Sequence, residues 1–142
     1  MKIRTLIAAL SLIVAVPVMH AADADVAATI AAQVKANPDN AAQIVADAIK
    51  ANPSLAPDIA AAAVKAAPGK ARAITTAAIK AAPDQILAIA RAETKAVPAQ
   101  GRNIYSASIA EVVDRGNVGP GVVSGLNGIL VQSIVGGIAP GN

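Results

Sequence analysis

The chain has 142 residues, which is a typical length for one domain. It contains no Cys, Trp or Phe, one Tyr and one His, so it lacks thiol nucleophiles, disulfides and thiolate metal ligands. Its formal net charge is +3, and it offers a single aromatic side chain, too few for a surface that stacks bases. We therefore predict a protein that is not an enzyme and that binds no cofactor, metal or nucleic acid.

Residues 1–21 have the features of a secretory signal peptide. Lys2 and Arg4 form a positive start, an apolar run covers 6–18, and small residues follow at the expected cleavage site. The run is short for a membrane span, although an uncleaved N-terminal anchor is the alternative. We predict export to the periplasm or cell surface. Removal of 1–21 leaves ten basic and nine acidic side chains, a net charge of +1.

A 15-residue repeat runs through residues 22–116, which we predict to be the folded domain. Each unit has a lysine, two further residues and a proline, and an isoleucine follows the proline by six positions. The lysines are Lys35, Lys50, Lys65, Lys80 and Lys95, and the isoleucines are Ile44, Ile59, Ile74, Ile89 and Ile104.

Each unit predicts one helix, as the segment 37–50 illustrates. Asn37 suits the capping position, where its side chain can accept a hydrogen bond from the first turn, and Pro38 suits the first helical position. Asp39 favours the positive end of the helix dipole. Apolar residues then recur at helical spacing, and Lys50 lies in the last turn, where a cation is favourable. The recurring lysine thus has a structural explanation.

The units together predict an all-α fold with six repeat helices. The first helix is expected over 23–36 and the sixth over 99–115, where Gly116 is a natural stop. The links are so short that each helix must turn back on the last, which predicts a short antiparallel helical repeat array, an α-solenoid or a bundle. One long helix kinked at every proline is the alternative, at a cost of about 3 kcal/mol per proline.

The last predicted region, 117–142, is rich in glycine and has no charged side chain. It is too apolar for an ordinary disordered tail. It can cover the end of the array, serve as an assembly or partner-binding segment, or enter a membrane, for which the Gly121 and Gly125 spacing is one weak indication. The candidate assembly residues are Val122, Val123, Leu126, Ile129, Leu130, Val131, Ile134 and Val135.

Two classes of function fit these features. The first is a structural or protein-interaction protein, a scaffold or assembly component that binds itself or a protein partner. The second is an envelope-associated protein that binds anionic lipid or polymer surfaces through the five repeated lysines and the apolar tail. The first is favoured, because the net charge after cleavage is small and each lysine already has a structural reason.

Overall fold

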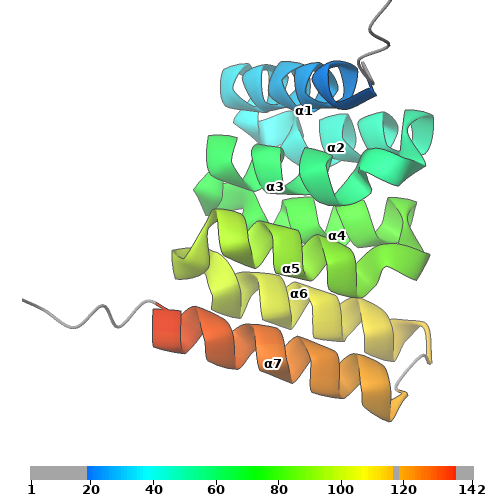
Figure 1. The fold of residues 1–142 in the computed structure, drawn as a ribbon, viewed down its shortest axis with the longest axis vertical. Coiled ribbons are helices and arrows are strands. Elements are labelled where there is room, and N and C mark those ends of the chain that lie inside the picture. Colours follow the sequence, from blue (N-terminus) through cyan, green and yellow to red (C-terminus); the bar gives the residue numbers. More distant parts are fainter. Residues whose placement is uncertain (1–18, 117–118, 137–142) are drawn as a thin grey trace, which may run out of the picture.

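The computed structural model describes residues 19–116 and 119–136 of the chain. These residues form seven α-helices and no strand, so the prediction of an all-α repeat fold is confirmed (Figure 1). The first helix begins at Met19, four residues earlier than predicted. The helices are α1 (Met19–Ala36), α2 (Ala41–Ala51), α3 (Ala56–Ala66), α4 (Ala71–Ala81), α5 (Ile86–Ala96), α6 (Gly101–Asp114) and α7 (Pro120–Gly136).

Each helix from α2 to α6 is preceded by a short 3-10 turn that begins at the repeated proline and continues directly into the α-helix. The residue before each proline is not helical, with φ between −139° and −135° and ψ between 68° and 80°, because proline disfavours helical geometry in its predecessor. The helices therefore break at one residue per unit. The turns are Pro38–Asn40, Pro53–Leu55, Pro68–Lys70, Pro83–Gln85 and Pro98–Gln100.

The prediction that the Asn37 side chain caps α2 is wrong. Asn37 makes no side-chain capping hydrogen bond; its carbonyl oxygen instead accepts the backbone N–H of Asn40 at 3.1 Å. Ala67 closes the same turn with Lys70 at 2.9 Å, although alanine has no polar side chain. The turn is thus held by the backbone and by proline, which explains why the residue before proline varies along the array.

The helices alternate in direction and stack in two layers (Figure 1). The most extensive contacts join helices two apart in sequence, so α1, α3 and α5 form one layer while α2, α4 and α6 form the other. The same ends of α2 and α4 are joined by Lys70 and Asp39, whose Nζ and Oδ1 atoms lie 2.9 Å apart. This packing rules out the single kinked helix. It also means that the structure repeats every two sequence units, one helix in each layer.

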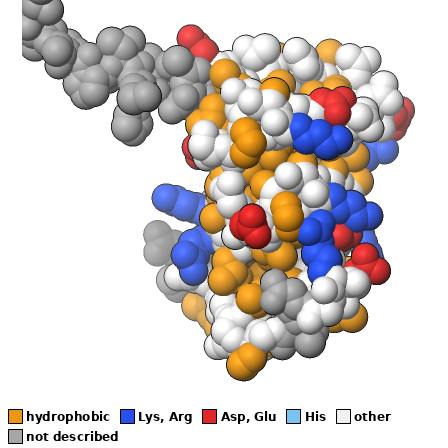
Figure 2. All heavy atoms as spheres, turned by 90° about the vertical axis from the view of Figure 1, so that its right-hand side faces the viewer, with side chains coloured by type: hydrophobic (Ala, Val, Ile, Leu, Met, Phe, Trp, Pro, Cys, Tyr) orange, Lys and Arg blue, Asp and Glu red, His pale blue; other side chains and the backbone are white. Residues whose placement is uncertain are grey.

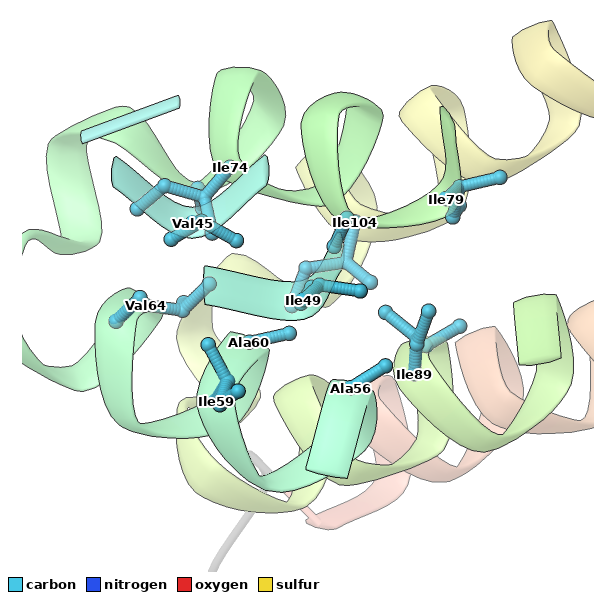
Figure 3. Close-up of a cluster of buried hydrophobic side chains, with 14 of the residues drawn as sticks. Val45, Ile49, Ala56, Ile59, Ala60, Val64, Ile74, Ile79, Ile89 and Ile104 are labelled. Carbon is cyan, nitrogen blue, oxygen red and sulfur yellow. The ribbon is translucent and has the colours of Figure 1, made fainter. Parts of the chain in front are cut away.

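The core lies between the two layers and consists of Ile, Val and Ala side chains that point toward one another (Figure 3). The repeated isoleucine is fully buried in four units, at Ile59, Ile74, Ile89 and Ile104. Ile44 occupies the same position in α2 but is half-buried, because the described residues place no earlier helix of its layer beside α2. The apolar residues that recur at helical spacing in each unit therefore form the core of the protein.

The end of α6 agrees with the sequence. Gly116 has φ +66°, a left-handed conformation that glycine adopts without strain, and its N–H donates to the carbonyl of Val113 at 3.0 Å. Beyond it, α7 packs on both α5 and α6. A Cβ atom at Gly101 of α6 would overlap the Ser133 side chain of α7, so glycine is needed for this close approach.

This packing agrees with the interpretation of the C-terminal segment as a cover for the end of the array. Leu126 and Ile129 of α7 are buried and join the main apolar core. Within 19–116 and 119–136, no helix combines the length and apolarity that crossing a membrane requires.

Candidate functional site

The repeated lysines do not form one ladder. All five lie in the last turn of their helices, as predicted. Because the helices alternate in direction, Lys35, Lys65 and Lys95 lie on one edge of the array, at the ends of α1, α3 and α5. Lys50 and Lys80, at the ends of α2 and α4, lie on the opposite edge. The prediction of a continuous five-lysine ladder is therefore wrong.

The two edges also differ in ion pairing. Lys50 Nζ lies 3.9 Å from Asp47 Oδ1 of the same helix, and Lys80 Nζ lies 3.6 Å from Glu111 Oε1 of α6. Lys35, Lys65 and Lys95, which we call the lysine edge, form no ion pair with any residue that the structure describes. Figure 2 shows one face of the protein, on which several acidic side chains lie beside basic ones among apolar side chains.

Glu111 has a larger structural role than the sequence indicates. Its spacing from Arg115 predicts a surface pair, but the Glu111 side chain is only 9% exposed. Arg115 Nε lies 4.0 Å from Glu111 Oε2, and an Arg115 terminal nitrogen donates to the carbonyl of Ile79 at 3.4 Å. Together with Lys80, these groups join the ends of α4 and α6, so they stabilise one layer of the array.

The structure divides the predicted assembly segment into buried and exposed residues. Leu126 and Ile129 of the possible assembly segment pack against the preceding helices and belong to the core, so their side chains do not face a partner. Three others are the most exposed apolar side chains of α7: Val131 at 58%, Ile134 at 43% and Val135 at 64%. We call these three residues the α7 face. Val122, Val123 and Leu130 are half-buried.

A buried carboxyl group is the feature that sequence reasoning missed. Glu93 of α5 is 0% exposed and lies beside Thr75 of α4. Counting along the repeat places Glu93 where earlier units have Ala48, Ala63 and Ala78, of which the last two are buried. The alignment of the repeat units could therefore have predicted the burial of Glu93, because a glutamate at a repeat position that is otherwise a buried alanine must enter the core.

The hydrogen bonds around Glu93 fit a protonated carboxyl group. Thr75 Oγ1 lies 2.7 Å from Glu93 Oε2 and 2.8 Å from the carbonyl oxygen of Ala71. A hydroxyl group has one proton to donate, so it cannot serve both acceptors. If Glu93 carries a proton, Glu93 donates to Thr75 and Thr75 donates to Ala71. Burial raises the pKa of Glu93 to about 8, against the opposing contact with Thr75.

The other carboxyl oxygen of Glu93 does not take part in these hydrogen bonds. Oε1 has no hydrogen-bond partner among the described residues, and the hydroxyl of the neighbouring Thr94 has none either. No cluster of acidic side chains that could bind a metal occurs in the described part of the chain. Because the pKa of Glu93 is about 8, its carboxyl group is mainly protonated at neutral pH, and its protonation is linked to the stability of the fold.

In comparisons with known proteins, no family model, curated protein or solved structure matches this chain.

Proposed function

We propose that this protein is a non-enzymatic scaffold or assembly protein that is exported to the periplasm or cell surface and self-associates through the α7 face. The observation that supports this proposal is the exposure of Val131, Ile134 and Val135 on the last described helix of the array. An exposed group of apolar residues on a folded protein marks an interaction site.

The charge of α7 favours a second copy of the chain as the partner. Two identical faces meet in a symmetric dimer, so any charge on the face would be brought against itself. No residue from Pro120 to Gly136 is charged, and the α7 face therefore meets its copy without such repulsion. Apolar burial is then the favourable contribution to the free energy of association.

The proposal of export depends on the sequence alone. Residues 1–18 of the predicted signal peptide lie outside the described residues, and residues 19–21 are the first residues of α1. The absence of cysteine means that the protein needs no disulfide to remain folded in an oxidising compartment, because the packing between layers holds the array.

A charge placed on the α7 face tests self-association. We expect the mass of the full chain in light scattering after size exclusion to rise with concentration, and Ile134→Glu to shift it to the monomer, because burying an unpaired carboxylate is costly. Val113→Glu is the matched control: Val113 is an apolar α6 residue, 59% exposed, outside the α7 face. A wild-type monomer at every concentration, or equal effects of both variants, would contradict the proposal.

The alternative function is binding to anionic lipid or polymer surfaces through the lysine edge. It is favoured by the unpaired state of Lys35, Lys65 and Lys95 within the described residues. Each lysine near an anionic membrane contributes about 1 kcal/mol, so replacement of all three by Gln should weaken binding to phosphatidylglycerol vesicles by roughly 100-fold. Replacement of Lys50 and Lys80 is the control. Salt-insensitive binding, or equal effects of the two sets, would exclude this alternative.

A further inference from the structure

We propose that a groove between α5 and α7 binds a long-chain carboxylate, the anion of a fatty acid. Two adjoining hollows of about 450 and 510 Å³ lie along this pair of helices. Arg91, Ile129 and Gln132 line both hollows, so the two are parts of one groove. Ligand binding here does not require the proposed self-association, although Val131 and Val135 border the groove and also belong to the α7 face.

The groove arises because α7 does not repeat the packing of the helices before it. The contact between α5 and α7 is less extensive than the contact between α3 and α5. The two helices approach closely at Gly125, where an added Cβ atom would lie 2.9 Å from a methyl carbon of Leu87. A Cβ atom at Gly128, one turn further along, would have no other atom within 4 Å. The open space is thus built into α7 by its glycines.

One wall of the groove is positively charged. Arg91 and Lys95 lie one turn apart on α5, both are exposed, and neither forms an ion pair within the described part of the chain. None of the residues that line either hollow is acidic. The charge of the groove is therefore complementary to an anion, and the planar guanidinium of Arg91 can hold a carboxylate through two parallel hydrogen bonds.

The other wall is largely apolar. Ile129, Val131 and Val135 of α7 line it, and the segment of α7 from 124 to 135 that borders it is about 16 Å long at the rise of an α-helix. The Thr94 hydroxyl, buried without a hydrogen-bond partner among the described residues, belongs to a residue at the end nearest Lys95. A cationic wall facing a long apolar wall suits a ligand with one anionic head and an aliphatic chain.

The volume and chemistry favour a small amphiphile over a macromolecule. Each hollow is within the range of about 300 to 1,000 Å³ that small-molecule sites occupy. The lining residues include no aromatic side chain on which a base or a ring could stack.

Dodecanoate, kept below the concentration at which it forms micelles, is the probe for the first test. The readout is the ¹⁵N–¹H spectrum of the full chain, in which the amides of Gly125 and Gly128 report on the groove and that of Gly69 is a remote reference. We expect saturable shifts at the two groove glycines. Arg91→Gln should weaken binding about tenfold or more, because a charge-assisted hydrogen bond is lost. Arg72→Gln, a change at an exposed arginine of α4 outside the groove, should have no effect.

A second variant fills the groove without removing charge. Gly128→Leu should abolish the shift of the Gly125 amide while leaving thermal unfolding intact, because its Cβ atom meets open space. Gly121→Leu is the matched control, since Gly121 also faces open space on α7 but does not line the groove. Repeating the titration in Ile134→Glu separates ligand binding from self-association.

Related probes decide the chemistry of the ligand. Dodecanol and dodecyltrimethylammonium should bind more weakly than dodecanoate by a factor similar to that of Arg91→Gln, and acetate should not bind. If dodecanol binds as tightly as dodecanoate, the groove is an apolar surface that does not recognise the anion. If acetate binds as tightly as dodecanoate, the groove recognises only the charge. If dodecanoate causes no shift while an acidic helical peptide does, the groove is a peptide site. Each of these three results would overturn the proposal.

Discussion

Replacing Glu93 by Gln should remove most of the pH dependence of unfolding and stabilise the protein at alkaline pH. The pKa of Glu93 is about 8 in the fold, against an ordinary value of 4.5. Between these two values the folded protein keeps a proton that the unfolded chain has released. Because the folded state binds more protons, the free energy of unfolding falls as the pH rises through this window.

The expected magnitude of this effect is large for one side chain. The slope approaches about 1.4 kcal/mol per pH unit in the middle of the window. The contribution of protonated Glu93 to the free energy of unfolding is fully present below its ordinary pKa of 4.5. It is lost as the pH rises through about 8, the pKa of Glu93 in the folded protein. The glutamine side chain of the Glu93→Gln variant would remain neutral throughout, and its amide can donate to Thr75 as the protonated carboxyl group does.

Urea unfolding at about pH 5, 6.5 and 8 measures this slope directly. Glu93→Ala is a useful second variant, because it restores the residue of earlier units and also removes the titrating group, although it leaves a cavity. Both variants should show a flatter dependence than the wild type. A slope that persists in Glu93→Gln would show that another group is responsible and that Glu93 is ionised in the fold.

Replacing Ile74 by Ala should lower the free energy of unfolding by about 2 to 5 kcal/mol. Ile74 is 0% exposed and lies in the core between the two layers (Figure 3). The core to which it belongs contains many alanines, whose short side chains cannot move to fill the space. The loss therefore includes both the burial of the removed carbons and the cavity that remains. For a domain whose total stability is about 5 to 15 kcal/mol, this is a severe change.

Ile44→Ala is the matched control for this prediction. Ile44 has the same place in its repeat unit, but it is half-buried on α2. The same chemical change should cost less than half as much there, because solvent already reaches the site and no closed cavity forms. Urea unfolding at one fixed pH, with the slope of the transition compared between variants, gives both values. Equal losses at Ile44 and Ile74 would mean that burial between the layers does not set the cost of the substitution.

The position of the lysines was already implied by the sequence. Antiparallel helices of equal length place the ends of successive units on opposite edges, so a five-lysine ladder and an antiparallel array exclude each other. The structure keeps the array and divides the lysines. The lysine edge, Lys35, Lys65 and Lys95, follows from taking every second unit.

Other parts of the candidate sites required the tertiary structure. An uncharged apolar segment does not show which of its residues pack inward, and in α7 this depends on its two neighbours: Leu126 and Ile129 are buried while Val131 and Ile134 are exposed. The groove beside Arg91 arises from the departure of α7 from the repeat packing, and the glycines of α7 alone do not show which helix they face.

The sequence by itself determined where each repeat helix ends, because proline acts on its own backbone and on the residue before it. It also determined which side of each helix is buried, because the spacing of Ile and Val matches the helical period. Only the tertiary structure decided the neighbours of each buried side. Helices two units apart pair Lys80 with Glu111, and the adjacent α4 places Thr75 beside the buried Glu93. The contacts of α7 with both α5 and α6 decide which of its residues stay exposed. Local geometry defines the helices, whereas contacts between distant residues define the surfaces and sites.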